Sequence, residues 1–246
     1  MSGLSVMTTM RRVGHKGADH IAPGNTFASF AAALAAGVDA IEFDVISEHR
    51  DGTGELLLAH DFEDAAQRDP HTLEEGLAHF AASDAPYHAV DLIIDLKLAG
   101  YEARVAAAIE RYGLGRRSLV STMEEASLAL LRERHPQVRL GWSVPRLQRD
   151  PLRNPLVAVP AFVLMHYMRG ALPSVAANRI RRGEIDALMA HWRLATPRLA
   201  RCIREAGGEL YAWTVDDRRR IAGLERMGVT GVISNDPRLF GAGATP

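Results

Sequence analysis

Three acidic side chains and one lysine have the spacing needed to build a catalytic site. Glu42 and Asp44 are two residues apart in the segment IEFD, and Asp95 and Lys97 are two apart in DLK. Side chains at positions i and i+2 of a β-strand point to one face, so each pair would converge on one side of a sheet. Burying several carboxylates together is costly unless a cation joins them, and carboxylate oxygens suit Mg²⁺ or Ca²⁺ better than zinc. We therefore predict one divalent metal ion held by Glu42, Asp44 and Asp95, in preference to salt bridges with arginines at the rim of the fold.

Two histidines could supply acid/base chemistry beside this cluster. His15 in GHKG and His60 in AHD each close a segment of predicted β-structure. Histidine titrates near neutral pH, so one ring could remove a proton from a nucleophile while the other donates a proton to a leaving group. The other eight of the ten histidines lack comparable neighbours, and we interpret them as structural.

The segments that would carry these residues alternate between apolar β-rich runs and amphipathic helical patterns. This alternation is typical of repeated βα units around a parallel sheet, whose strands are buried on both faces and therefore nearly all apolar. Eight strands are predicted, at 11–15, 40–45, 92–98, 118–122, 139–144, 185–191, 209–215 and 230–235. Helices are predicted at 26–37, 72–83, 101–113, 124–135, 196–208 and 217–228, and a ninth apolar run, 161–168, is interpreted as helical. The pattern predicts an α/β fold, a single (β/α)8 TIM barrel domain over residues 1–246, with its chemistry at the C-terminal ends of the strands.

One connection departs from simple βα alternation. The segment GELLLAHD follows the turn residues Asp51, Gly52 and Gly54, so we predict a β-hairpin after strand 2. Its returning arm would bring His60 back to the mouth of the barrel. Between His60 and Asp95 only one helix is predicted, which would leave the mouth open.

Composition limits the classes of partner. The chain has 246 residues, 47% of them hydrophobic and 24% charged, with a formal net charge of -1 and one cysteine. These values exclude disorder, an internal disulfide and a general attraction to nucleic acid. The first residues lack a signal-peptide pattern and no apolar run approaches about 18 residues, so we expect a cytoplasmic protein without a stable membrane anchor. No residue pattern specifies an oligomeric state.

Several motifs resemble, in order and spacing, those of the glycerophosphodiester phosphodiesterase family. The segments GHKG, PGNT, GVDAIEFDV and AHD are similar to the family's HRG, PENT, GAD-IE-DV and HD, and DLK, SLVST, AWTV and GVISNDP extend the resemblance over nearly the whole chain. The resemblance implies a (β/α)8 barrel that binds one Mg²⁺ or Ca²⁺ and cleaves a small-molecule or lipid-derived glycerophosphodiester to glycerol 3-phosphate and an alcohol. By position it implies metal ligation by Glu42, Asp44 and Asp95, acid/base catalysis by His15 and His60, phosphate contact by Lys16 and Lys97, and an apolar wall at Trp213. The free hydroxyl beside the phosphate of such a substrate favours a route through a cyclic phosphate.

Three departures from the family pattern concern substrate choice. Lys16 replaces an arginine and loses its planar bidentate grip, Gly24 replaces the glutamate of PENT, and Ser234 and Asn235 replace the TD of the last motif. The family also commonly carries an insertion where only one helix is predicted here. An open mouth would favour an alternative, a lysophospholipase D-like phosphodiesterase acting on acylated substrates. A barrel that binds a phosphorylated metabolite without turnover ranks last, because all three acids and both histidines are present.

Overall fold

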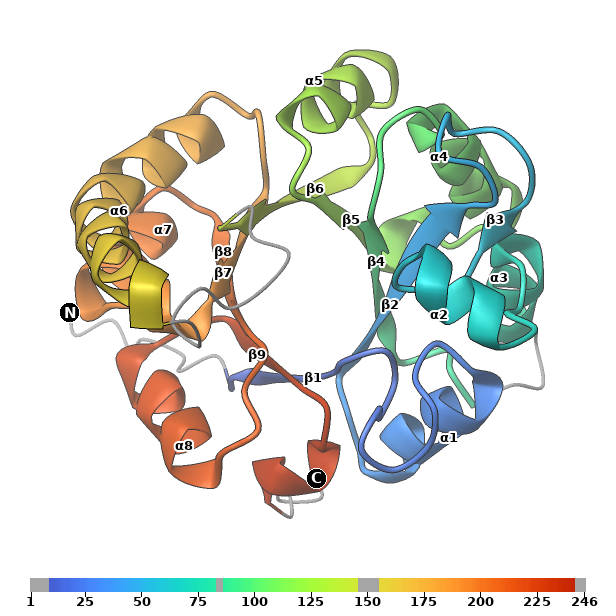
Figure 1. Ribbon diagram of the computed structural model, residues 1–246, viewed down its shortest axis with the longest axis horizontal. Coiled ribbons are helices and arrows are strands. Elements are labelled where there is room, and N and C mark those ends of the chain that lie inside the picture. Colours follow the sequence, from blue (N-terminus) through green and yellow to red (C-terminus); the bar gives the residue numbers. More distant parts are fainter. Residues whose placement is uncertain (1–8, 83–85, 146–154, 242–246) are drawn as a thin grey trace, which may run out of the picture.

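Eight parallel strands close into a barrel in the part of the chain that the structure describes (Figure 1). The structure is a computed structural model and describes residues 9–82, 86–145 and 155–241. The strands are hydrogen-bonded in the order β1-β9-β8-β7-β6-β5-β4-β2, and pairing of β1 with β2 closes the ring. Their bounds are β1 (Arg11–Gly14), β2 (Ala40–Ser47), β4 (Asp91–Leu96), β5 (Ser118–Thr122), β6 (Arg139–Val144), β7 (Ala187–His191), β8 (Glu209–Trp213) and β9 (Gly231–Ser234). The predicted (β/α)8 barrel is confirmed.

Helices connect the strands and form the outer layer of the barrel (Figure 1). Two of them begin with capping boxes, at Thr26 with Ser29 and at Thr72 with Glu75, which satisfy the backbone N–H groups of the first turn. The helix bounds are α1 (Phe27–Ala35), α2 (Phe62–Gln67), α3 (Leu73–Ala81), α4 (Glu102–Arg111), α5 (Glu125–Arg134), α6 (Pro155–Arg181), α7 (Pro197–Glu205) and α8 (Arg218–Met227). The run 161–168 lies within α6, as predicted. No helix among the described residues combines the length and the apolar character needed to cross a bilayer.

The connection from β2 to β4 contains the predicted hairpin. The short strand β3 (Leu56–Leu57) pairs antiparallel with Ile46 and Ser47 at the end of β2. Two turn glycines, Gly52 and Gly54, have φ of 86° and 79°, a backbone region that side chains other than glycine rarely adopt. The chain then returns toward the barrel mouth.

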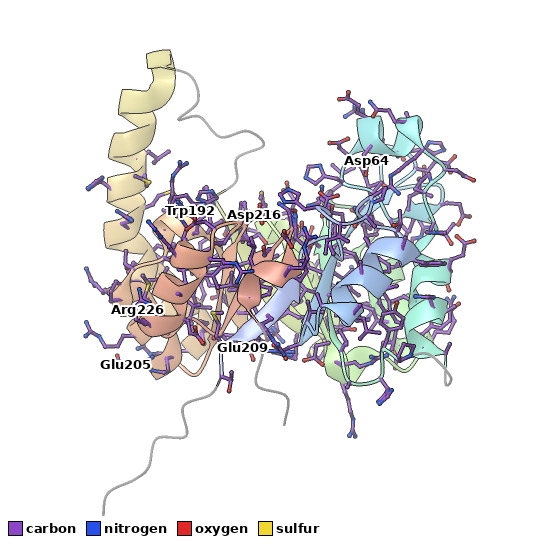
Figure 2. The ribbon with its side chains drawn as sticks, turned by 90° about the horizontal axis from the view of Figure 1, so that it is seen from below. Asp64, Trp192, Glu205, Glu209, Asp216 and Arg226 are labelled. Atoms are coloured by element: carbon purple, nitrogen blue, oxygen red, sulfur yellow. The ribbon has the colours of Figure 1, made fainter. Side chains whose placement is uncertain are left out.

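The prediction of a single helix between His60 and Asp95 was wrong, because α2 precedes α3 in this connection. Asp61 caps α2 by accepting a hydrogen bond from the N–H of Asp64. The helix has six residues and buries none of them, so its sequence carries no apolar periodicity. Figure 2 shows this helix, with Asp64 labelled, on the same side of the barrel as Asp216, which follows β8. The mouth is therefore more covered than the sequence indicated.

The barrel interior is layered, because strand side chains alternate between the two faces. A lower apolar layer fills the barrel, made by Val13, Ala40, Ile93, Leu119, Ala187, Met189, Tyr211 and Ile233. On seven of the eight strands, the inward-facing residue one layer nearer the mouth is polar or aromatic. These residues are His15, Glu42, Asp95, Ser121, His191, Trp213 and Asn235. Asp44 follows Glu42 in the same alternation, one layer higher. The predicted site residues therefore lie directly above a packed apolar layer.

Candidate active site

Three carboxylates from two neighbouring strands meet inside the barrel. β2 and β4 pair in a register that puts Asp44 opposite Asp95. Glu42, Asp44 and Asp95 each offer one oxygen, and these three atoms all lie within 4.8 Å of one another. Glu42 and Asp44 are buried, and Asp95 is partly exposed. Three convergent carboxylate oxygens fit a hard divalent cation such as Mg²⁺ or Ca²⁺.

Lys97 neutralises part of this cluster from just beyond the end of β4. Its Nζ lies 2.5 Å from Asp44 Oδ1 and 2.7 Å from Asp95 Oδ2. The sequence had indicated arginines as the alternative partners of the acids, but this lysine is the paired cation. Since it bridges two proposed ligands, Lys97 positions the carboxylates as well as facing the mouth.

Two further polar side chains, which the sequence analysis did not single out, hold the acids in place. Asn25 donates from Nδ2 to Asp44 Oδ2 at 3.0 Å, and its Oδ1 accepts the backbone N–H of Asp44 at the same distance. Ser121 donates to Asp95 Oδ1 at 2.6 Å. Asn25 belongs to the quoted PGNT segment and Ser121 to SLVST, so the motifs that carried the resemblance contained the signal. Both residues fix carboxylate orientation before any cation binds.

The electrostatics of the three acids differ. Burial and then the negative charge of Asp44 raise the pKa of Glu42 well above its usual range. Burial also acts to raise the pKa of Asp44, but the ammonium groups of Lys97 and Lys16 outweigh it and hold that pKa below the usual range. Burial opposes the charge of Lys97, yet Asp44 and Asp95 raise its pKa above normal. Of Glu42 and Asp44, Glu42 is therefore the carboxyl that binds a proton more readily.

His15 stands at the end of β1 with its ring orientation fixed by Asn235. The distance from His15 Nδ1 to Asn235 Oδ1 is 2.6 Å. The amide of Asn235 is oriented in turn, because its Nδ2 donates to Asp216 Oδ2 at 2.7 Å. The amide oxygen therefore faces the ring and accepts a hydrogen bond from Nδ1–H. His15 Nε2 is left with a lone pair and lies 3.8 Å from Glu42 Oε2. Burial lowers the pKa of His15, which also favours the neutral ring.

His60 lies just before α2, in a more exposed place. Its side chain is 47% exposed, and Nδ1 is 3.0 Å from Asp61 Oδ2. The backbone N–H of His60 donates to Asp64 Oδ2 at 2.9 Å, which ties the residue to α2. His60 is near enough to Asp44 for its charge to lower the pKa of that carboxyl. The structure thus puts His15 beside Glu42, whereas His60 is at the exposed rim and acts on Asp44 through its charge.

Lys16 adds a second positive charge at the mouth. Its Nζ lies 4.0 Å from Asp44 Oδ2 and 3.9 Å from Asp19 Oδ2. Asp19 also accepts the backbone N–H of Gly24 at 2.9 Å. A Cβ at Gly24 would come within 2.6 Å of Asp19 Oδ1 and 2.8 Å of Lys16 Cβ, so this loop requires the glycine that departs from PENT. Asp19 thus supplies a carboxylate beside Lys16, in a loop where Gly24 replaces the glutamate of PENT.

Trp213 lies across the barrel at the end of β8. Its indole Nε1 donates to the carbonyl of Met189 at 2.9 Å. The ring is half-buried and meets His191 edge-on, with centroids 5.4 Å apart. The hydrogen bond to Met189 therefore fixes the orientation of the Trp213 ring and satisfies its N–H group. The rest of the ring is apolar.

A closed barrel with convergent carboxylates, two histidines and two lysines at its mouth defines a class, the (β/α)8 barrel hydrolases of phosphate esters. The family model described as "Glycerophosphoryl diester phosphodiesterase family" matches residues 15–63 and 88–239. The chain belongs to this family and is a phosphoric diester hydrolase.

Individual relatives agree with this assignment. The chain is 24% identical to the glycerophosphodiester phosphodiesterase of Caldanaerobacter subterraneus subsp. tengcongensis, over 92% of this chain and 93% of that protein. Its fold is similar to a glycerophosphodiester phosphodiesterase from Parabacteroides distasonis, with a TM-score of 0.69, 16% identity and 94% coverage of both chains. It is also similar to an Oleispira antarctica phosphodiesterase in complex with the product sn-glycerol-3-phosphate, with a TM-score of 0.65, 18% identity and 94% coverage of both chains.

Proposed function

We propose that this protein hydrolyses glycerophosphodiesters to glycerol 3-phosphate and an alcohol with one divalent cation, Mg²⁺ or Ca²⁺. The observation that carries the proposal is the convergence of Glu42, Asp44 and Asp95 beside two histidines. When bound, the cation would supply electrostatic stabilisation of the extra negative charge that develops on the phosphate. Membership of the family and the product named for the Oleispira relative support the substrate class.

The two histidines take different roles in this proposal. His15 has its Nδ1 proton directed at Asn235, so the lone pair on Nε2 can accept the proton of the attacking hydroxyl. His60 lies at the rim beside Asp61, where a protonated ring can donate to the departing alcohol oxygen. Lys16 and Lys97 face the same space and would contact phosphate oxygens, and Trp213 would border the glycerol or the alcohol.

The nucleophile in the first step is the substrate's own hydroxyl next to the phosphate. His15 takes its proton, the hydroxyl oxygen bonds to phosphorus, and the bond to the alcohol oxygen breaks as His60 protonates that oxygen. This produces a cyclic glycerol phosphate. Water then opens the ring with the histidine roles reversed, which restores both protonation states and yields glycerol 3-phosphate.

A comparison of two substrates tests the cyclic route. Glycerophosphocholine and its analogue without the neighbouring hydroxyl should be assayed at equal concentration, with the products followed by phosphorus NMR. We expect a transient cyclic phosphate from the first and very slow cleavage of the second. Equal rates would replace this route with direct attack by water, although the two histidines could still act as base and acid.

Acylated substrates are the second candidate. The argument from an open mouth is weakened by α2, but the exposed apolar side chains of α6 at the same end of the barrel favour lipid-derived diesters. Turnover of lysophosphatidylcholine should then match or exceed that of glycerophosphocholine, and a strict preference for the small diester would remove this candidate. Binding without turnover is not favoured, because both histidines and all three acids are in place. A cytoplasmic location stays a prediction from the sequence.

A further inference from the structure

Helix α6 differs in length from the other helices of the described chain. It has 27 residues, whereas the other α-helices have between 6 and 10. At about 1.5 Å per residue it is roughly 40 Å long. Figure 2 shows α6, the yellow helix, extending past the level of Trp192 and Asp216 on the side of the barrel mouth. Its N-terminal half therefore stands clear of the barrel, at the end where the candidate active site opens.

Apolar side chains are exposed along one face of this helix. Leu164, Tyr167 and Val175 are 51%, 72% and 46% exposed, and Ala171 is partly buried between them. Spacings of three, four and four residues put these four side chains on a single helical face. Among the described residues only one other large hydrophobic side chain, Ile21, is classed with them as exposed. The preceding nine residues of the helix, PLVAVPAFV, carry no charge.

All of the formal charge on α6 is positive. The sequence of the helix contains Arg169, Arg179 and Arg181 and neither aspartate nor glutamate. Arg169 is in the middle of the helix, whereas Arg179 and Arg181 are in its last turn, where Arg179 pairs with Glu125 and Glu184. α8 begins with the exposed residues Arg218, Arg219 and Arg220, and its N-terminus is at the mouth end because it follows β8. Arginine and apolar side chains thus occur together at this end of the barrel. These arginines would attract an anionic surface.

Trp192, which is close to α6, also suits an anionic lipid surface. The guanidinium carbon of Arg220 lies 3.7 Å from the centroid of the Trp192 ring, and that of Arg193 lies 4.8 Å from it. Arg169 of α6 donates to the backbone carbonyl of Arg193 at 2.8 Å, which connects the helix to this group. Tryptophan and arginine are the residues that anchor proteins at the boundary between lipid headgroups and acyl chains.

We propose that the N-terminal half of α6 docks on the surface of an anionic lipid bilayer, with Leu164 and Tyr167 entering the headgroup region and the arginines contacting lipid phosphates. In this proposal the contact is peripheral and reversible, because only side chains on one face of the helix enter the headgroup region. Because α6 extends from the mouth end, docking would turn the barrel mouth toward the membrane. The proposal does not depend on which phosphodiester the site cleaves.

Vesicle flotation of the full chain tests this inference. The probes are vesicles of pure phosphatidylcholine and of equimolar phosphatidylcholine and phosphatidylglycerol, neither containing a lysolipid. We expect binding to the anionic vesicles only, with release as salt is raised. The double variant Leu164→Ser/Tyr167→Ser should lower the bound fraction at least about tenfold, because two exposed apolar side chains lose their favourable transfer.

Val175→Ser is the matched control. Val175 lies on the same face, but 11 residues from Leu164 and so about 16 Å further along the helix toward the barrel. It should bind vesicles as the wild type does. Circular dichroism and turnover of glycerophosphocholine in solution should be unchanged in all variants, since none of the three residues belongs to the site. Release of the wild-type protein from anionic vesicles at high salt tests the proposal without any variant.

Two results would overturn the proposal. One is wild-type protein that floats equally poorly with both vesicle types. The other is a concentration-dependent dimer in light scattering that is lost with Val175→Ser as well as with the double variant. That result would make the exposed apolar face of α6 an interface between protein chains.

Discussion

Asn235 and His15, separated by 220 residues in the chain, are joined by a 2.6 Å contact between Oδ1 and Nδ1. Pairing of β1 with β9 brings them together, and Asp216 fixes the amide so that its oxygen faces the ring. This contact selects the histidine tautomer that leaves Nε2 free to accept a proton.

Replacement of Asn235 should therefore lower turnover without changing substrate or metal binding. Asn235→Leu removes the acceptor, and we expect kcat to fall by about 10²-fold with KM nearly unchanged, because a misplaced base loses most of its contribution. Asn235→Asp keeps an acceptor for Nδ1 but loses the donor to Asp216, so we expect a smaller loss of kcat than in Asn235→Leu. Steady-state kinetics on glycerophosphocholine measure both.

Two neighbouring aspartates provide a matched pair for this test. Asp216→Asn should reduce kcat by releasing the amide of Asn235, whereas Asp217→Asn should not, since Asp217 only caps α8 and asparagine caps equally well. Wild-type kcat in Asn235→Leu would show that the contact has no part in catalysis.

Replacing Lys97 should affect stability and turnover in different ways. Lys97→Met leaves Asp44 and Asp95 without their paired cation, and breaking a buried ion pair costs about 3 kcal/mol or more. The metal-free variant should unfold at a lower temperature, and Mg²⁺ or Ca²⁺ should restore much of the loss while binding more tightly than to the wild type. Turnover should stay low, because the phosphate has lost a positive partner.

Thermal unfolding and titration calorimetry, each with and without the cation, measure these effects. Asp95→Asn is the control, since it removes a proposed ligand and should weaken cation binding. If added cation leaves the stability of Lys97→Met unchanged, the acid cluster is an internal ion-pair network and not a metal site.

His60 should show the behaviour of a general acid. His60→Ala should lose orders of magnitude in kcat on glycerophosphocholine with cation binding intact. A p-nitrophenolate leaving group departs without protonation. His60→Ala should therefore lose less activity on a substrate with this leaving group than on glycerophosphocholine. His15→Ala should have a low kcat on both substrates, because this variant lacks the general base that both reactions need. Equal losses of both variants on both substrates would contradict the assignment of roles.

The ion pair of Asp39 with Arg12, at the opposite end of the barrel, should make the free energy of unfolding depend on pH. Asp39 Oδ2 accepts from the backbone N–H of Arg12 at 2.7 Å and from its Nε at 3.1 Å. Burial alone would raise the pKa of Asp39, but the hydrogen bonds from Arg12 lower it. A lowered pKa stabilises the fold above the unfolded pKa of about 4, and this contribution is lost as pH falls through the folded value.

Asp39→Asn should therefore reduce the free energy of unfolding at pH 7 by less than about 1 kcal/mol, because the side chains are partly exposed. The difference from wild type should narrow as pH falls below about 4. Urea unfolding at several pH values measures it, and a difference that is the same at pH 7 and pH 3 would exclude the ion pair as its origin.

Strand patterns made the barrel and its acids predictable from sequence. A parallel barrel strand is buried on both faces, so a carboxylate within an apolar run such as that of Glu42 stands out. The two-residue alternation then puts Asp44 on the same inner face as Glu42, and Lys97 on the same face as Asp95. This local rule needs no knowledge of distant contacts, and the structure confirms the convergence it predicts.

Contacts across the barrel and short exposed elements were harder to predict. The role of Asn235 depends on ring closure between the first and last strands, so the sequence showed only a departure from TD. α2 is six residues long and buries none of them, so it leaves no periodic signal. Lys97 was expected to face phosphate, and its bridging of two carboxylates depends on the register of β2 and β4.

Hydrolysis of glycerophosphocholine by demetallated protein, with and without added Mg²⁺ or Ca²⁺, tests the central claim most directly. The three carboxylates are proposed to hold a cation on which phosphate cleavage depends. We predict no release of glycerol 3-phosphate from the demetallated protein and full recovery after the cation is added. Full activity of thoroughly demetallated protein would contradict the claim.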